Sequence, residues 1–334
     1  TFGTGKWHQS RESFARSFSR GRNVFFGGMS DHGAVPLQDL LPEGGFSEVR
    51  TEGFSTDLFV DAAIEFLEGH AATDAQTPFL AYVAFTAPHD PRTPPEEYGQ
   101  MYAGTGQPLP PNYMPVHPFH NGWMTGRDEQ LAAWPRPPEV IGEQLGEYYG
   151  LIIHVDARIG DLFATLQSTG LADRTVVFFA SDNGLALGSH GLLGKQSLYE
   201  HSTHVPLIVA GPGIPAGESQ ALVMLYDLFP TIAGLTGVEM PDGVEGLDLS
   251  ALWRGDAPRV REVIYTAYED KMRAVRDGRF KLIRYPLLDS VQLFDLERDP
   301  YELRNLADDP DYADERARLT TLLETEHARL EDPH

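Results

Sequence analysis

The sequence predicts an α/β protein with a mostly parallel central sheet, followed by a smaller α+β unit at the C-terminal end. Up to about residue 250, short apolar segments rich in β-branched and aromatic residues alternate with amphipathic helical segments. This order is typical of a parallel sheet covered by helices. After Gly255 the pattern changes to short strand-like segments joined by tight turns. We therefore expect one domain over residues 1–255 and a second over residues 256–334.

Apolar segments and helical periodicity define the elements of the first domain. Residues 55–70 have apolar side chains at helical spacing and a cap at Ser55 or Thr56. Residues 143–167 form a second amphipathic helix, which ends at Gly170. Segments with the composition of short strands lie at residues 23–28, 78–85, 175–180 and 205–210. None of these segments carries a charged residue, and we expect the last three strands to be buried.

The second domain is expected to contain a small antiparallel sheet and one helix. Strand-like segments lie at residues 263–267, 272–275 and 279–284. The pair Asp277-Gly278 between the last two is a hairpin signal. Residues 311–330 form an amphipathic helical pattern, whose apolar side carries Leu319, Leu322, Leu323 and Leu330.

The composition excludes several classes of protein. The 334 residues carry a net charge of −23, which argues against a nucleic acid partner. No apolar run approaches the ~20 residues that a membrane span needs. The chain has no cysteine, so it contains no disulfide, no thiolate zinc site and no cysteine nucleophile. A local cluster of Lys and His can still bind an anionic small substrate in such an acidic chain.

A candidate metal site follows the strand-like segment at residues 175–180. Asp182 and Asn183 come directly after it, and a glycine-rich stretch leads from Gly184 to Lys195. Carboxylate and amide oxygens are hard ligands, which suit Ca²⁺ or Mg²⁺. The carboxyl ends of buried strands commonly hold ligands. Taken alone, this stretch is better explained by an Asp-Asn-Gly turn that binds no metal; the other motifs of the chain favour the metal site.

Two further segments offer side chains for an anion. In an extended segment Lys6 and His8 face the same side, so both can meet one anion with Trp7 packed behind them. His89 follows the segment at residues 78–85 and lies between prolines, a position suited to chemistry. An exposed N-terminus and a capped loop histidine are the alternatives for these residues.

A long segment without clear periodicity, residues 92–140, has the character of an ordered loop that lines a site. Its aromatic and histidine content favours a sizeable polar substrate. The candidates for substrate contact in this loop and before it are Asp31, His32, His117, His120, Trp123 and Arg127.

Four motifs occur in an order and spacing known from one protein family: Gly5-Lys6-Trp7-His8, Ala87-Pro88-His89, Ser181-Asp182-Asn183-Gly184, and Gly194-Lys195 with Tyr199-Glu200 and Val205-Pro206-Leu207. Together they resemble the type I, formylglycine-dependent sulfatases, and the runs at residues 273–276, 281–283 and 293–300 are similar to that family's tail. The resemblance implies an alkaline-phosphatase-like sandwich with a smaller C-terminal domain. It also implies that Asp182 and Asn183 bind Ca²⁺, with Mg²⁺ as the alternative. The residues implied to surround the sulfate are Lys6, His8, His89 and Lys195.

The resemblance further implies a mechanism. In this family a hydrated formylglycine attacks sulfur, the alcohol leaves, and a base then expels sulfate to regenerate the aldehyde. We expect His89, assisted by Lys195, to protonate the leaving oxygen and His8 to be the base. The formylglycine arises from a Cys/Ser-x-Pro-x-Arg motif upstream of Gly5-Lys6, and an Asp pair lies further upstream; this chain has neither. We therefore expect an N-terminally truncated sulfatase that is inactive alone, from a periplasmic or secreted protein.

Two alternatives remain open. Phosphate and phosphonate monoester hydrolases of the same superfamily commonly have His where Asn183 stands, because softer metal ions favour imidazole. Asn183 therefore favours calcium and sulfate. A non-catalytic relative that keeps the anion pocket would bind sulfated glycans without turnover. For the sulfatase we expect a small-molecule or oligosaccharide sulfate ester as the substrate, such as a sulfated sugar, and neither nucleic acid nor membrane as a partner.

Overall fold

The computed structural model describes all residues from Thr1 to His334 and contains two compact units. Unit 1 comprises Thr1–Pro108 and Glu139–Thr175, and unit 2 comprises Leu109–Pro138 and Val176–His334. No helix combines the length and the apolar character that crossing a membrane requires. The domain boundary near residue 255 stays a prediction.

Unit 1 is built on a mixed sheet of four strands in the order β3-β2-β1-β4. The central strand β1 (Phe2–Lys6) runs parallel to β2 (Arg20–Phe25) and to β4 (Ala81–Ala84), whereas β3 (Gln38–Leu40) is antiparallel to β2. Because β1 and β4 are parallel neighbours, the segments that leave their carboxyl ends emerge at the same edge of the sheet.

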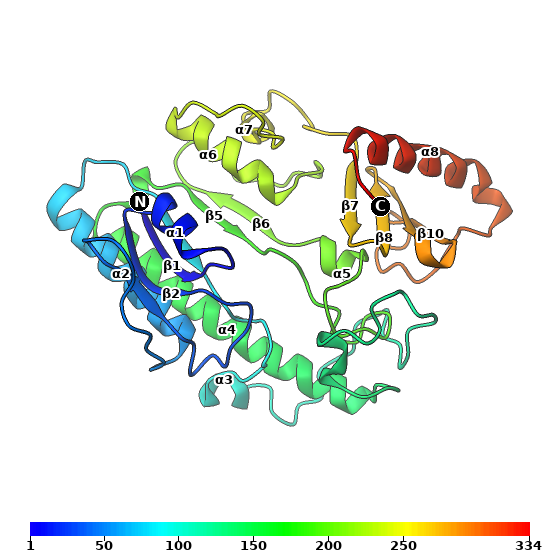
Figure 1. Cartoon of the computed structure of the whole chain (residues 1–334), viewed down its shortest axis with the longest axis horizontal. Helices are drawn as coiled ribbons and strands as arrows, with labels where there is room; N and C mark the ends of the chain where they lie inside the picture. Colours follow the sequence, from blue (N-terminus) through cyan, green and yellow to red (C-terminus); the bar gives the residue numbers. More distant parts are fainter. The chain divides into compact units, whose positions relative to one another are not determined.

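Helices cover this sheet and supply its core. The helix α2 (Ser55–Asp74) packs against β1, β2 and β4 (Figure 1). Its Phe66 ring stacks on Phe2 of β1 with ring centroids 4.6 Å apart. Leu162 of the 31-residue helix α4 (Pro138–Ser168) packs against the same cluster. Two shorter helices, α1 (Arg11–Ser17) and α3 (Glu96–Gln100), complete the unit together with the 3₁₀ turn η2 (Ala172–Arg174).

The predicted cap of α2 is wrong in one respect. Helix α2 does begin at Ser55, but Phe54 occupies the cap position and no side-chain hydrogen bond closes that end. The Ser55 hydroxyl is fully buried and is hydrogen-bonded instead to Thr86 Oγ1 at 2.8 Å. A longer-range polar contact has therefore replaced the local cap that the sequence favours.

Unit 2 contains a two-stranded sheet that corrects the expected pair of buried strands. Strand β5 (Val177–Ala180) pairs with β6 (Leu207–Ala210), but in antiparallel register, with Val177 opposite Ala210. Phe179 and Ile208 remain 40% and 59% exposed. The connection between the strands holds only the short helix α5 (Glu200–Thr203), so it turns back instead of forming a helical crossover to a parallel neighbour.

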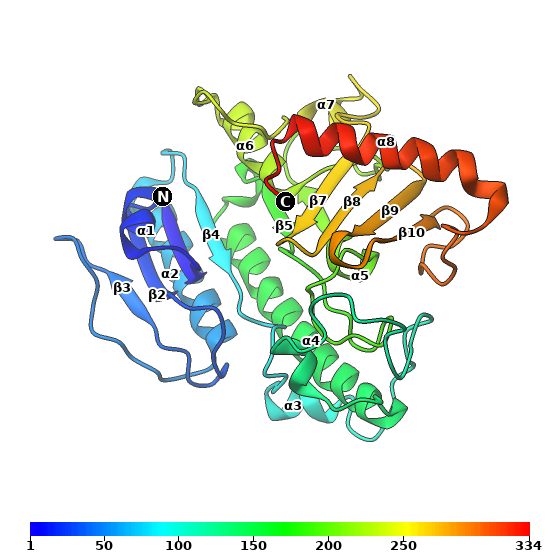
Figure 2. The same ribbon diagram turned by 45° about the vertical axis from the view of Figure 1, so that its right-hand side comes forward.

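The C-terminal part of unit 2 confirms the predicted antiparallel sheet and helix. Its strands lie in the order β10-β9-β8-β7, and helix α8 (Ala313–Arg329) lies across them (Figure 2). The Asp277 carboxylate accepts hydrogen bonds from the backbone N–H groups of Arg279 and Phe280 and so closes the predicted hairpin. The strand bounds are Ile264–Tyr268 for β7, Met272–Arg276 for β8, Phe280–Tyr285 for β9 and Ser290–Asp295 for β10.

The two faces of this C-terminal sheet bury different partners. One face packs Val275, Leu282 and Leu293 against α8. The other face carries Ala274, Ile283 and Phe294, which pack against the segment at residues 186–199. The remaining helices of unit 2 are α6 (Leu228–Thr236), α7 (Ser250–Arg254) and the 3₁₀ turns η1 (Asp128–Leu131), η3 (Leu225–Asp227), η4 (Pro286–Leu288) and η5 (Pro310–Tyr312). The sheet is thus the platform on which the segment before and after Lys195 rests.

Candidate functional site

The carboxyl edge of β1 and β4 carries three of the predicted site residues. Lys6 is the last residue of β1 and His8 follows two residues later. His89 lies in the turn after β4. Gly5 makes the close pairing of the two strands possible, because its φ is 93° and a Cβ there would lie 2.0 Å from the Ala84 carbonyl oxygen. The structure therefore groups Lys6, His8 and His89 at one edge of unit 1.

Trp7 anchors the segment between Lys6 and His8. Its Nε1–H donates to Ser13 Oγ at 2.9 Å, and its ring makes edge contacts with Phe14 and Phe18. This packing confirms the predicted role of Trp7. The His8 ring lies over Gly28, where a Cβ would come within 3.3 Å of His8 Cε1 and Nε2.

The His89 ring is oriented by its sequence neighbour. Its Nδ1 lies 2.9 Å from the Asp90 carbonyl oxygen and 3.2 Å from Asp90 Oδ1, and the side chain is 16% exposed. With Nδ1–H donating to Asp90, Nε2 is the ring atom whose protonation can change.

His32, considered above as a substrate contact, is an internal support. It is 1% exposed; its Nε2 lies 2.9 Å from the His89 carbonyl oxygen and its Nδ1 lies 3.1 Å from Thr86 Oγ1. Burial lowers the pKa of His32, against the opposing effect of the His89 carbonyl. His32 thus holds the turn that carries His89, and its burial contradicts a contact with substrate.

Asp182 and Asn183 follow β5 in unit 2. The exposed Asp182 accepts the Asn183 N–H through Oδ1 at 2.9 Å, and Asn183 Nδ2 donates to the Gly184 carbonyl at 2.9 Å. This leaves the Asn183 amide oxygen as the acceptor of that side chain. The Gly184 N–H donates to the Ser202 carbonyl at 3.0 Å, so the turn is fixed on its far side as well.

The side-chain oxygens of this turn are of the chemical type that a hard cation binds. Its carboxylate and amide oxygens are ligands that Ca²⁺ and Mg²⁺ prefer. No group of three or more His, Cys, Asp or Glu side chains forms a metal cluster in the structure. Asp182 and Asn183 would therefore supply two oxygen ligands of a Ca²⁺ ion, which takes about six to eight.

Lys195 lies at the end of a closed turn. The Ala186 N–H donates to the Gly194 carbonyl at 2.9 Å, and the Gly188 N–H donates to the Leu192 carbonyl at 2.8 Å. Asp128 is next to this turn. Burial acts to raise the pKa of Asp128, but the hydrogen bonds from Gln196 and Arg127, together with the charge of Lys195, outweigh burial and lower this pKa. The backbone directly before Lys195 is therefore held in place by several hydrogen bonds.

The structure assigns different roles to the aromatic and His-rich loop residues. His117 is buried at 4% exposure, with Nδ1 2.7 Å from the His190 carbonyl oxygen, so it is internal. Trp123 packs under the Lys271 ammonium, 5.3 Å from the ring centroid, whereas His120 is exposed. Of these three residues His120 keeps the exposure that a substrate contact requires, and so does Arg127, whose side chain is 51% exposed and paired with Asp128.

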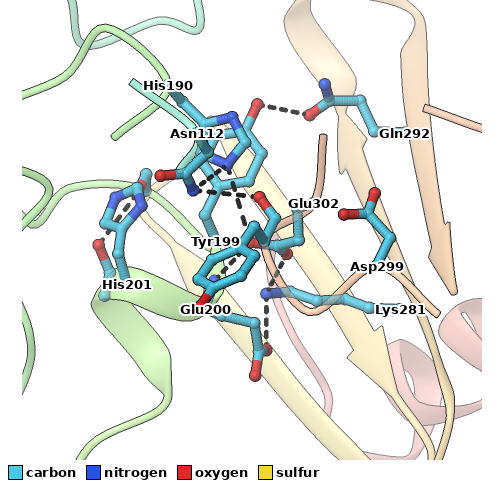
Figure 3. Close-up of polar contacts among 12 residues, drawn as sticks. Asn112, His190, Tyr199, Glu200, His201, Lys281, Gln292, Asp299 and Glu302 are labelled. Carbon is cyan, nitrogen blue, oxygen red and sulfur yellow. Dashed lines mark hydrogen bonds and ion pairs between the residues drawn. The ribbon is translucent and has the colours of Figure 1, made fainter. Parts of the chain in front are cut away.

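Sequence reasoning missed a cluster of largely buried charged residues formed by Glu200, Lys281 and Glu302 (Figure 3). Lys281 Nζ donates to Glu302 Oε1 at 2.8 Å and to Glu200 Oε1 at 3.0 Å. The Glu200 N–H donates to Glu302 Oε2 at 2.7 Å. The available signal was weak: Glu200 lies within a motif, but its partners are 81 and 102 residues away in sequence.

The charges of this cluster are strongly coupled. Burial acts to raise the pKa of Glu200, but His204, Lys281 and Arg276 outweigh it and lower that pKa to about 2. Burial raises the pKa of Glu302, although Lys281 opposes the effect. The cluster therefore fastens the start of α5, which follows Lys195 by a few residues, to strand β9.

Comparison with known proteins identifies what the chain is similar to. The family model described as Sulfatase matches residues 1–238, and the model described as N-sulphoglucosamine sulphohydrolase, C-terminal, matches residues 188–329. A choline-sulfatase of Rhizobium meliloti is 32% identical over 257 residues, which is 74% of this chain and 50% of that protein. An arylsulfatase of Clostridium perfringens is 28% identical, covering 80% of this chain and 56% of its own length. The chain spans about half the length of these curated relatives.

Solved structures share the fold. A structure described as a complex with its substrate D-glucosamine-2-N,6-O-disulfate aligns with a TM-score of 0.80 at 24% identity, over 99% of this chain and 80% of that chain. A phosphonate monoester hydrolase of Agrobacterium radiobacter aligns with a TM-score of 0.70 at 25% identity, over 82% of this chain and 60% of that chain. The α/β class is confirmed by these alignments, and the chain's similarity extends to relatives that act on different anions.

Proposed function

Because this chain belongs to the sulfatase family, we propose that the protein is a sulfuric ester hydrolase that releases sulfate from a sulfated carbohydrate or an aryl sulfate. The observation that carries the proposal is the grouping of Lys6, His8 and His89 at the shared carboxyl edge of β1 and β4. The resemblance found in the motifs is confirmed by the family match. The proposed substrate class is supported by relatives such as an N-acetylglucosamine-6-O-sulfatase of Bacteroides thetaiotaomicron, 25% identical over 98% of this chain and 70% of its own length.

The proposed roles of the cationic residues follow from the charge of the ester. A sulfate ester is an anion, and its negative charge moves towards the leaving oxygen in the transition state. Lys6 and Lys195 bind sulfuryl oxygens, since a compact ammonium is a strong partner for such an oxyanion. His8 and His89 also contact the sulfate.

Two histidines carry the proposed proton transfers. His89 donates a proton to the departing alkoxide from Nε2, while Asp90 holds Nδ1 and stabilises the charged ring. Lys195 assists this step. His8 is the base that accepts a proton when sulfate is released.

A metal ion and a nucleophile complete the proposal. Asp182 and Asn183 would hold Ca²⁺, or Mg²⁺, and such a cation polarises sulfuryl oxygens. The nucleophile would be a formylglycine in a part of the protein outside these 334 residues, since the chain has no cysteine and no Cys/Ser-x-Pro-x-Arg motif. The 334-residue chain alone is then inactive. We also propose a periplasmic or secreted location.

A phosphonate or phosphate monoester hydrolase is the second candidate. The alignment with the Agrobacterium radiobacter phosphonate monoester hydrolase favours it. Asn183 argues for sulfate, because a softer metal ion would be better served by a histidine at this position. Turnover of sulfate and phosphonate esters by the full-length protein separates these two functions, and preferred phosphonate release would overturn ours.

Alanine variants of Lys6, His89 and Lys195 in the full-length protein test the proposed roles. Each should lower kcat/KM for a sulfate ester by at least about 100-fold, as expected for lost transition-state contacts. His70→Ala and Lys271→Ala are matched controls, because His70 is bonded to the Thr77 carbonyl and Lys271 to surface carboxylates. Full activity of the three site variants would contradict the proposal.

A further inference from the structure

One buried carboxylate holds the turn that ends at Lys195. Glu129, in the 3₁₀ turn η1, is 5% exposed. Its Oε1 accepts the Gly194 N–H at 2.8 Å and its Oε2 accepts the Leu193 N–H at 3.0 Å. The two amides directly before Lys195 are therefore fixed by a side chain from another part of unit 2.

Arg136 completes this contact. Its side chain is fully buried and its Nη2 donates to Glu129 Oε2, so the buried carboxylate has a charged partner. Its Nε donates to the Gly191 carbonyl at 2.9 Å. Burial raises the pKa of Glu129, and the Gly194 N–H and Arg136 oppose the rise. Glu129 thus binds two N–H groups of the turn, and Arg136 binds one of its carbonyl groups.

The residue after Lys195 is held by the neighbour of Glu129. Gln196 Nε2 donates to Asp128 Oδ2 at 2.9 Å, and the Asp128 side chain is 2% exposed. A Cβ on Gly194 would lie 2.8 Å from Asp128 Cβ, so the two backbones are in close contact. Consecutive acidic residues thus hold the two backbone amides before Lys195 and the side chain of the residue after it.

We propose that Glu129 is a positioning residue for Lys195: it fixes the backbone from which the lysine reaches the anionic substrate, and this role rests on the proposed sulfatase function. A lysine side chain has four flexible torsions, so the position of its Cα atom determines which region the ammonium group can reach. A displacement of about 1 Å at a catalytic group can cost about 100-fold in rate.

A double-mutant cycle between Glu129→Gln and Lys195→Ala in the full-length protein tests the proposal. Glu129→Gln alone should lower kcat/KM for a sulfate ester by about 10- to 100-fold. In the Lys195→Ala background it should lower kcat/KM by less than about twofold, because the group it positions is already gone. A merely structural role would give equal losses in both backgrounds.

Asp227→Asn is the matched control. Asp227 is fully buried, and it accepts the Met224 N–H at 2.7 Å, the Leu247 N–H at 2.9 Å and Arg261 Nη2 at 2.7 Å. It holds a different turn of unit 2 in the same way as Glu129 holds the Lys195 turn. This variant should lower the melting temperature but show the same fold-change in kcat/KM with and without Lys195.

Two further measurements keep the test informative if Glu129→Gln folds poorly. Gln196→Ala removes the contact with Asp128 and the acceptor of the Lys195 N–H, and its smaller loss of kcat/KM should also vanish in the Lys195→Ala background. Hydrogen exchange of the Leu193 and Gly194 amides should accelerate at least about tenfold in Glu129→Gln while the amides of α8 keep their protection.

Each outcome decides a different question. Additive losses in an active protein, or unchanged exchange of the Leu193 and Gly194 amides, would overturn the positioning role alone. A wild-type protein that neither turns over sulfate esters nor binds inorganic sulfate would overturn the proposed function, and the positioning role with it. Non-additive losses together with locally faster exchange are the expected result.

Discussion

Replacing Lys281 by methionine tests the buried charged cluster of unit 2. The Lys281 side chain is 3% exposed and lies between Glu302, which is 1% exposed, and Glu200, which is 13% exposed. Methionine has a similar length and no charge. The variant therefore leaves both carboxylates in place without their shared ammonium.

The structure indicates how large the effect should be. At the observed 2.8 Å to Glu302, and with an effective dielectric constant of about 20, one ion pair is worth roughly 6 kcal/mol before desolvation is subtracted. Removing one partner of a buried pair typically costs about 3–5 kcal/mol, because an uncompensated charge stays behind. Glu200 keeps Arg276 at 3.0 Å, whereas Glu302 keeps mainly the Glu200 N–H. We therefore expect a loss of about 3–5 kcal/mol, which falls mostly on Glu302.

Urea unfolding of the 334-residue chain at pH 7 measures this loss; it is followed by tryptophan fluorescence, to which Trp123, Trp134 and Trp253 of unit 2 contribute. The double variant Lys281→Met with Glu302→Gln should recover about 2 kcal/mol, because its glutamine oxygen still accepts the Glu200 N–H without a charge. Lys271→Met, in a half-exposed surface pair, should cost less than about 1 kcal/mol.

The pH dependence gives a second check on the same variant. Burial already raises the pKa of Glu302, and the loss of Lys281 raises it further. A carboxyl group with a raised folded-state pKa destabilises the protein fully above that folded-state pKa; the cost shrinks as the pH falls below it and is gone below the unfolded-state pKa. The deficit of Lys281→Met should therefore shrink from pH 8 towards pH 5. A deficit under about 1 kcal/mol, or one that the Glu302→Gln change makes larger, would refute the reasoning.

The remaining predictions concern a buried histidine, two glycines and the proposed metal ligand. Burial lowers the pKa of His190 from 6.5 to about 4, so stability should fall by at most about 3 kcal/mol as the pH drops from about 6.5 to 4. His190→Asn, which suits the observed φ of 53°, should flatten that part of the curve in urea unfolding, and an unchanged slope would contradict the assignment. Gly184→Ala places a Cβ 1.9 Å from the His201 carbonyl oxygen and should cost more than about 2 kcal/mol. Gly69→Ala, at an open position of α2, should instead stabilise the protein by up to about 1 kcal/mol. Thermal unfolding of both variants measures the two effects. Equal effects would show that the backbone contact at Gly184 is unimportant. Asp182→Asn should weaken Ca²⁺ binding to the full-length protein at least about tenfold by calorimetry, and unchanged affinity would remove Asp182 from the ligand set.

Elements with a strong local pattern could be predicted from the sequence. The apolar periodicity of α2 and α4 and the hairpin signal at Asp277 are properties of neighbouring residues, and the structure has these elements. Helix α1 was not predicted, because its short sequence Arg11–Ser17 has one buried residue, Phe14, and thus no period to detect. The antiparallel pairing of β5 with β6 depends on how the connecting segment turns, which strand composition does not encode.

The site could be predicted only where its residues lie in motifs. Lys6 ends a strand, and His8 and His89 follow strands whose ends a sequence pattern can locate. Glu129 and Arg136 carry no such signal, since Glu129 meets the Leu193 amide from 64 residues away in sequence. Long-range polar contacts of this kind depend on the tertiary fold and are not visible in local composition.

The most direct test of the proposed function is the turnover of 4-nitrophenyl sulfate and 4-nitrophenyl phosphate by the full-length protein, with and without the Lys195→Ala change. The two substrates share a leaving group, so the ratio of their kcat/KM values reports only on the anion. We predict a clear preference for the sulfate ester and a loss of at least about 100-fold in Lys195→Ala. A preference for the phosphate ester, or sulfate release that does not depend on Lys195, would contradict the account.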